Sequence, residues 1–176
     1  MSSYHFPFKL GSRVVELGGG TTPLFRPNLD IMLGENVDYV CDLAEGIPLK
    51  DGEWDGIWCQ FCLEHIRHAK VRHFIAEAHR ILKPGGVAVF ITANLYEQAK
   101  KLVETDEWND GLVNMVFGGD PDYPGNYHHT GFSPKFAYKL FKEAGFYQVR
   151  IGPLAGCITD MLIEATKSQA QVEVAA

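Results

Sequence analysis

The chain has 176 residues, of which 46% are hydrophobic and 12% aromatic, so it can bury one substantial core, and we expect a single domain over 1–176. Its formal net charge of -6 argues against a protein that binds nucleic acid by neutralising phosphates. No apolar run is long enough for a membrane span, and the first residues lack a secretory signal, so we expect a cytoplasmic protein without a membrane partner.

Short apolar runs predict the strands of the first half of the chain, at residues 13–17, 28–31, 37–41, 54–60 and 87–92. The last run is almost wholly apolar, as in strands that are buried on both faces of a parallel sheet. Apolar residues at helical spacing predict a helix that ends at Lys83-Pro84-Gly85-Gly86, after about residue 82. A strand, a helix and a strand in this order imply a right-handed parallel crossover.

The second half of the chain begins with residues 94–130, which we interpret as an insert or lid with a helix over 95–104. Ser133 followed by Pro134 is a cap hydroxyl before a first-turn proline, which predicts a helix that stops at Gly145. Strands are predicted at 147–151 and 161–165, and residues 168–176 are expected to form a disordered tail.

Polar and glycine residues follow the predicted strands, at the sheet edge where open α/β sheets bind ligands. Consecutive glycines let the backbone approach a ligand closely, and carboxylates accept hydrogen bonds from hydroxyl or cationic groups. The candidate ligand-binding set is Glu16, Gly18, Gly19, Gly20, Asp30, Asp42, Leu43, Gln60 and Phe61.

In order and spacing, several segments resemble the class I S-adenosylmethionine-dependent methyltransferases, over about residues 13–166. The resemblance implies an α/β, Rossmann-like methyltransferase sheet that is mostly parallel with an antiparallel final strand. It also implies S-adenosylmethionine as the cofactor. The matching segments are Glu16-Leu17-Gly18-Gly19-Gly20, Asp30, Cys41-Asp42-Leu43, Trp54-Asp55-Gly56-Ile57, Leu63-Glu64-His65-Ile66 and Arg80-Ile81-Leu82-Lys83-Pro84-Gly85-Gly86.

The resemblance also implies a role for each candidate residue near the methionine and ribose parts of the cofactor. The backbone of Gly18 to Gly20 would face the methionine part, and Glu16 would reach its ammonium through water. Asp30 would accept hydrogen bonds from the ribose hydroxyls.

The adenine and methyl ends of the cofactor have their own implied residues. Asp42 would accept a hydrogen bond from the adenine amino group, and the Leu43 amide would donate to the ring. Gln60 and Phe61 would border the methyl group.

The chain departs from the family pattern between its first three strands. Nine residues, including Pro23 and Pro27, separate Gly20 from Asp30, so the first helix is expected to be missing or shortened. Six residues, 32–37, join the second and third strands, so the second helix is expected to be missing or shortened as well. Because parallel neighbours usually need a longer crossover, the second strand is expected to be rudimentary.

Missing helices would leave an apolar sheet face that another element must cover. The candidates are the 94–130 insert together with the aromatic start (Tyr4, Phe6 and Phe8), or a second subunit. Of these, we predict a homodimer.

Methyl transfer from a sulfonium requires the acceptor to be held in line, and a base is needed only if the acceptor must lose a proton. We favour His129 and His128 as acid/base groups, with Tyr127 as a hydrogen-bonding neighbour. His65 is an alternative, and the Tyr-His-His loop also fits a polar surface turn.

The spacing of Cys59 and Cys62, with His65 and His68 close behind, raises the alternative of a zinc site. Strand alternation turns Cys59 away from a neighbouring loop, and no second cysteine pair completes a four-ligand set, so no metal is expected.

Three functions fit the sequence to different degrees. We expect S-adenosylmethionine-dependent methyl transfer to a small, sugar-like or peptide acceptor. A catalytically inactive methyltransferase fold that binds or oligomerises is the alternative. A nicotinamide dehydrogenase ranks last, because Pro23 stands at its third glycine position and Asp30 comes too early.

Overall fold

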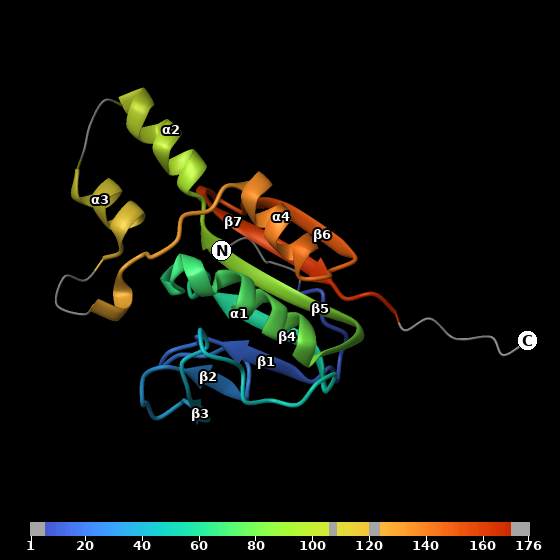
Figure 1. Ribbon diagram of the computed structural model, residues 1–176. Helices are drawn as coiled ribbons and strands as arrows, with labels where there is room; N and C mark the ends of the chain where they lie inside the picture. The colour runs from blue at the N-terminus through green and yellow to red at the C-terminus, as the bar shows by residue number, and fades with distance from the viewer. Residues whose placement is uncertain (1–5, 106–108, 120–123, 170–176) are drawn as a thin grey trace, which may run out of the picture.

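The computed structural model describes residues 6–105, 109–119 and 124–169 (Figure 1). They form a seven-stranded sheet with the order β3-β2-β1-β4-β5-β7-β6. The strands are β1 Val14–Leu17, β2 Asn28–Asp30, β3 Tyr39–Val40, β4 Trp54–Gln60, β5 Leu82–Ala93, β6 Gln148–Leu154 and β7 Cys157–Thr166. The helices are α1 His68–Ile81, α2 Leu95–Thr105, α3 Asp110–Phe117 and α4 Pro134–Glu143, with short 3-10 turns η1 Leu63–His65 and η2 Pro124–Asn126.

The pairing of the strands confirms the mixed sheet expected from the sequence. The first five strands pair in parallel, whereas β7 runs antiparallel to both of its neighbours, β5 and β6. The carboxyl ends of β1, β2 and β4 therefore meet at one edge, where polar loop residues can converge.

One face of the sheet is covered by α1 and α4, which lie side by side in front of the strands in Figure 1. The apolar stripe of α1 is buried, as its helical spacing predicts. Phe74 of α1 contacts Phe90 of β5, and Phe90 contacts Phe141 of α4, with ring centroids 6.1 and 5.0 Å apart. The Ser133 hydroxyl accepts a hydrogen bond from the Phe136 amide at 3.3 Å, so α4 begins where the sequence predicts.

The half of the sheet that holds β1, β2 and β3 lacks helical crossovers. Residues 18–27 and 31–38 connect these strands without a helix, and β2 and β3 have only three and two residues. The expected absence of the first two helices and the rudimentary second strand are both confirmed.

Aromatic residues cover part of the other sheet face. Phe6 and Phe25 lie with ring centroids 5.1 and 6.1 Å from that of Trp58, and Phe8 packs against Phe25. The aromatic start therefore covers this face, whereas α2 and α3 of the insert project beyond the sheet edge in Figure 1. Tyr4, also expected in this cover, lies outside the described residues.

Several element boundaries differ from the sequence prediction. β5 begins at Leu82 and includes the Lys83 to Gly86 segment expected to cap the helix. Lys83 pairs with Asp55 at 2.6 Å instead of the helix end, because the neighbouring β4 places that carboxylate within reach. Helix α3 lies in a stretch with no predicted helix. Of the tail expected over 168–176, residues 170–176 lie outside the described residues. Among the described helices, none has the apolar length that a membrane crossing requires.

Candidate functional site

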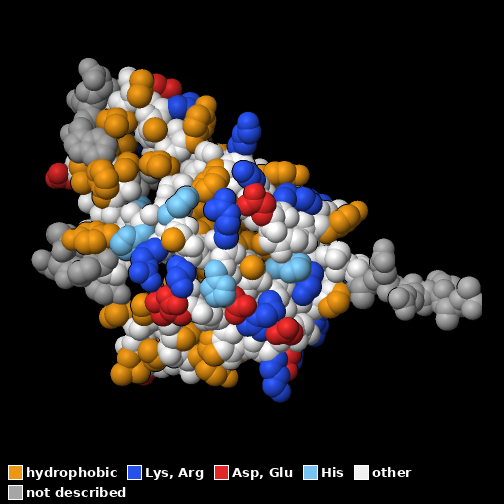
Figure 2. Space-filling model, viewed as in Figure 1, with side chains coloured by type: hydrophobic (Ala, Val, Ile, Leu, Met, Phe, Trp, Pro, Cys, Tyr) orange, Lys and Arg blue, Asp and Glu red, His pale blue; other side chains and the backbone are white. Residues whose placement is uncertain are grey.

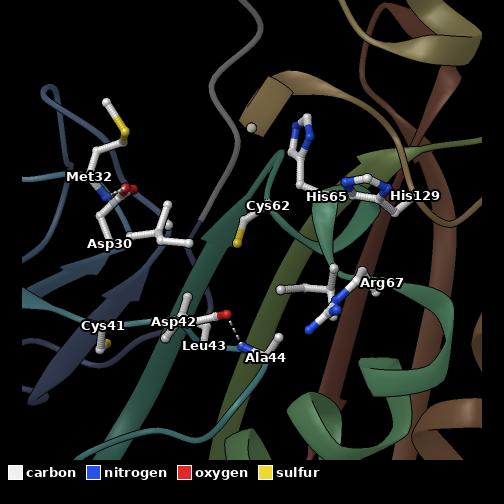
Figure 3. Close-up of a pocket in the computed structure, with 14 residues that line it drawn as sticks. Asp30, Met32, Cys41, Asp42, Leu43, Ala44, Cys62, His65, Arg67 and His129 are labelled. Atoms are coloured by element: carbon white, nitrogen blue, oxygen red, sulfur yellow. Dashed lines mark hydrogen bonds between the residues drawn. The ribbon is translucent and has the colours of Figure 1, made fainter. Parts of the chain in front are cut away.

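A cavity of about 480 Å³ lies at the carboxyl ends of β1, β2 and β4 (Figure 3). This is within the size range of small-molecule sites. In Figure 3, Asp30 and Met32 lie at one end, His65 and His129 lie at the other, and Cys62 lies between them. Its lining includes Gly18, Asp30, Asp42, Leu43, His65 and His129.

Asp30 is held in the cavity wall by two backbone amides. One carboxylate oxygen accepts from the Gly20 amide at 2.9 Å, and the other accepts from the Met32 amide at 2.9 Å. Each oxygen keeps a second lone pair, so the fixed carboxylate can still accept hydrogen bonds from a ligand.

Asp42 and Leu43 approach the cavity from the segment after β3. The Asp42 carboxylate accepts from the Ala44 amide at 2.8 Å, which fixes its orientation at the start of a turn. Leu43 is buried, whereas Asp42 is exposed. The structure thus brings Asp30, Asp42 and Leu43 to one cavity, as the sequence predicted.

The glycine loop contributes one residue to the cavity lining, Gly18. Its φ of +75° is a left-handed conformation, and an added Cβ would lie 2.5 Å from Cys62 Sγ, so a side chain is excluded here. Gly19 and Gly20 lie outside this lining; their amides donate to Asn28 Oδ1 at 3.0 Å and to Asp30.

Glu16 takes a different place from the expected one. Its side chain is buried outside the cavity lining, and one carboxylate oxygen accepts from the Leu24 and Phe25 amides at 2.6 and 2.7 Å. Burial raises the pKa of Glu16, and the two amide bonds oppose that rise. The loop that replaces the missing first helix has backbone amides without the carbonyl partners that a helix would provide. Glu16 accepts hydrogen bonds from two of these amides and so holds the loop in place.

Gln60 and Phe61 also lie outside the cavity lining. Phe61 has a φ of +50°, which is uncommon for a residue with a side chain. This turn at the end of β4 directs the chain so that the next residue, Cys62, lines the cavity instead. Sequence reasoning missed Cys62 and the lining residue Arg67, because their side-chain directions depend on this turn.

The Tyr127-His128-His129 loop is docked against η1. The His129 and Thr130 amides both donate to the Glu64 carbonyl, at 2.8 and 3.1 Å, and Thr130 Oγ1 donates to the Ile66 carbonyl. Only His129 of the three predicted catalytic residues lines the cavity. The Tyr127 carbonyl lies 3.1 Å from His65 Nδ1, which joins the loop to the strand end.

Glu64 is a buried carboxylate behind this loop, with 2% of its surface exposed. Its Oε2 accepts from the Thr92 hydroxyl at 2.8 Å. Burial raises the pKa of Glu64 to about 7, and Asp160 adds to the rise. A role for Glu64 could not be predicted from the sequence, because its contact with Thr92 forms only in the folded chain.

Burial and the carboxylates of the cavity act in the same direction on the pKa of a neighbouring thiol. Burial raises the pKa of Cys41, and the nearby Asp30 and Asp42 carboxylates raise it further. The end of the cavity beside Asp30 and Asp42 therefore has a negative local field, which favours cationic or hydrogen-bond-donating ligands.

Comparison with known proteins gives a consistent result. Residues 24–90 match a family model described as a methyltransferase domain. An uncharacterised methyltransferase of Synechocystis sp. is 31% identical over 81 residues, which are 46% of this chain and 37% of that protein. A ubiquinone/menaquinone biosynthesis C-methyltransferase of Methylobacterium nodulans is 36% identical over 50 residues, which are 28% of this chain and 19% of that protein. The chain thus matches well under half of the length of both curated relatives.

Solved structures share the fold at low sequence identity. An S-adenosylmethionine-dependent methyltransferase of Thermotoga maritima, titled a possible histamine N-methyltransferase, has a TM-score of 0.63 and 20% identity, covering 89% of this chain and 83% of that one. A Haemonchus contortus phosphoethanolamine N-methyltransferase bound to S-adenosylmethionine has a TM-score of 0.60 and 15% identity, covering 93% and 50%.

Proposed function

We propose that the chain is a class I S-adenosylmethionine-dependent methyltransferase and that it transfers a methyl group from this cofactor to a small polar acceptor. One observation carries the proposal. The carboxylates of Asp30 and Asp42, from two separate β-segments, line one cavity together with the side-chain-free Gly18.

The described residues fit the cofactor. The cavity of about 480 Å³ has room for an adenosyl ligand, and its negative end suits the ligand's hydroxyl and amino donors. Asp30 would hold the ribose hydroxyls, Asp42 the adenine amino group and the Leu43 amide the ring. Gly18 would allow the chain to approach the methionine part. When bound, S-adenosylmethionine supplies an activated methyl group on a sulfonium.

The other end of the cavity would receive the acceptor. His129 lines this end and would accept a proton from an acceptor hydroxyl or ammonium, with Tyr127 and His128 supporting its loop. His65 also faces the cavity, and burial lowers its pKa, which favours the neutral imidazole that can take a proton. Enclosure by the docked loop would exclude water from the reacting groups.

A homodimer is part of the proposal. Large apolar side chains are exposed around β3, and Figure 2 shows hydrophobic groups at the lower edge, where Figure 1 places β2 and β3. Light scattering after size exclusion should give about twice the 19.6 kDa of one chain. A mass of one chain across the concentration range would contradict a dimer. The exposed residues are Ile31, Met32, Leu33, Tyr39 and Val40.

Binding of the demethylated cofactor, S-adenosylhomocysteine, tests the proposal directly. Thermal unfolding of the wild type should shift upward with saturating ligand, because binding to the folded state alone stabilises it. Asp30→Ala should reduce the shift, whereas Asp51→Ala removes an exposed carboxylate outside the cavity and should keep it. No saturable shift up to millimolar ligand would instead favour an inactive binding module.

A further inference from the structure

Three side chains with metal-ligating atoms meet beside the acceptor end of the cavity. The ligand atoms of Glu64, His65 and His128 all lie within 4.8 Å of one another. Glu64 and His65 belong to η1, and His128 comes from the loop after η2, so distant parts of the sequence form the cluster. Cys59 and Cys62, considered for zinc from the sequence, do not join it among the described residues.

Glu64 is buried without a cationic partner in the described part of the chain. Its surface is 2% exposed, and its carboxylate accepts hydrogen bonds from the Thr92 hydroxyl and from the backbone amides of Glu64 and Ala93, all of them uncharged groups. None of the ion pairs of the described residues includes it, and the charged group that acts on it is another carboxylate, Asp160. Buried carboxylates are generally paired with cations or coordinate metals, because an isolated buried charge is costly.

Both histidines interact with backbone groups, and the interaction of His65 leaves one of its ring nitrogens available. His65 Nδ1 lies 3.1 Å from the Tyr127 carbonyl, and because a carbonyl only accepts, this nitrogen must carry the proton. His65 Nε2 then has a free lone pair. The His128 ring interacts with backbone groups of Met115 and Val116, near the end of α3. Metal-binding histidines usually donate their second nitrogen to a carbonyl or carboxylate in this way.

We propose that Glu64, His65 and His128 form a binding site for a divalent cation of the Zn²⁺ type. Two imidazoles and one carboxylate are a ligand set of catalytic zinc sites, which keep a further position open for water or substrate. Zn²⁺ ligands at about 2.1 Å are roughly 3.4 Å apart in a tetrahedron, so small side-chain movements would close the site. The cation would offset the buried charge of Glu64.

The position of the cation site next to the cavity would give the cation a role in binding the acceptor. His65 is shared between the cluster and the cavity wall, so the open position of the cation would border the acceptor end. A cation there would bind an acceptor through oxygen or nitrogen and favour its deprotonated form. This role rests on the proposed methyl transfer, whereas cation binding itself does not.

Titration of the metal-stripped full chain with Co²⁺ and then Zn²⁺ tests the inference, because bound Co²⁺ is visible by its absorption. The wild type should bind one equivalent per chain, and Zn²⁺ should displace the Co²⁺ signal. Glu64→Gln and His128→Ala should each weaken binding by at least about tenfold. His73→Ala, an exposed histidine of α1 outside the cluster, should bind like the wild type.

Two results would overturn the site: no saturable binding by the wild type, or unchanged affinity in both Glu64→Gln and His128→Ala. His65→Gln provides a third variant if either of these fails to fold by circular dichroism. S-adenosylhomocysteine binding, measured on the same samples, separates the two proposals. If the wild type binds the cation but not S-adenosylhomocysteine, the proposed function is contradicted and the cation site stands. If it binds S-adenosylhomocysteine but not the cation, the cation site is contradicted and the proposed function stands.

Discussion

The two halves of the sheet are stabilised in different ways. The half with β4, β5, α1 and α4 has regular crossovers and a core of large apolar side chains such as Phe74, Phe90 and Phe141. The half with β1, β2 and β3 has short loops in place of helices, and polar side chains bond to loop amides and carbonyls. Short crossovers can therefore be kept in place by buried polar contacts where no helix packs.

The difference has a consequence for binding. In the reduced half, Asp30 is fixed by a loop amide, and the carboxylate of Glu16 organises the same loops instead of facing the cavity. Structural and ligand-binding groups are therefore neighbours in this half. Damage to its polar network should reduce ligand affinity as well as stability, whereas damage to the helical half should reduce stability alone.

The largest expected effect is that of Phe74→Ala in the helical half. This fully buried ring packs against Phe90, so its removal should lower the free energy of unfolding by about 4 kcal/mol. Urea denaturation measures the loss, and Tyr138→Ala, an exposed aromatic of α4, is the control. A loss below about 1 kcal/mol would show that the core around α1 is not tightly packed.

A somewhat smaller loss is expected for Asn28→Ala in the reduced half. The fully buried Asn28 side chain accepts from the Gly19 amide and donates to the Gly20 and Asn36 carbonyls at 2.9 Å. Leaving these groups unpaired should cost about 3 kcal/mol, and affinity for S-adenosylhomocysteine should fall at the same time. Glu35→Ala, which changes an exposed side chain of the neighbouring connection, is the control.

Calorimetry under conditions where Asn28→Ala remains folded would distinguish the two halves. Unchanged S-adenosylhomocysteine affinity in Asn28→Ala would contradict the link between the polar network and the cavity. The corresponding titration of folded Phe74→Ala should give the wild-type affinity.

Asp42→Ala should affect ligand binding more than stability. Removing the carboxylate leaves the Ala44 amide without its hydrogen-bond acceptor, which should lower the free energy of unfolding by about 1 kcal/mol. The substitution removes no core volume. The lost contact with the adenine amino group should weaken S-adenosylhomocysteine binding by about tenfold or more in calorimetry. Unchanged affinity would place the adenine elsewhere.

The smallest expected effect is the pH dependence of Glu16→Gln. Because burial raises the pKa of Glu16 above its ordinary 4.5, ionisation opposes folding, and the wild type loses stability as pH rises through the folded pKa. Glutamine does not ionise. Between pH 4 and pH 7, the free energy of unfolding of the variant should therefore increase relative to that of the wild type. Parallel pH profiles in urea denaturation would contradict the assignment.

Local signals were enough to predict much of the fold. The Ser133-Pro134 start of α4 and the apolar stripe of α1 depend on neighbouring residues, and the missing helices on either side of Asp30 follow from the short connections there. The convergence of Asp30 and Asp42 followed from the sheet-edge rule, because parallel strands end at one side.

Long-range contacts explain what the sequence could not predict. Glu16 turns toward the Leu24 and Phe25 amides only because the loop between β1 and β2 folds over it. Glu64, His65 and His128 meet because the insert returns to η1, across more than 60 residues. β5 begins at Leu82 because pairing with β4 extends the strand through a segment whose proline and glycines favour a helix end.

A crystal structure of the chain with S-adenosylhomocysteine tests the central claim most directly. The account predicts the adenosyl group in the cavity, its ribose hydroxyls on the Asp30 carboxylate and its adenine amino group on Asp42, with the sulfur directed toward His65 and His129. A ligand bound in other surroundings, with both carboxylates free of contact, would contradict it.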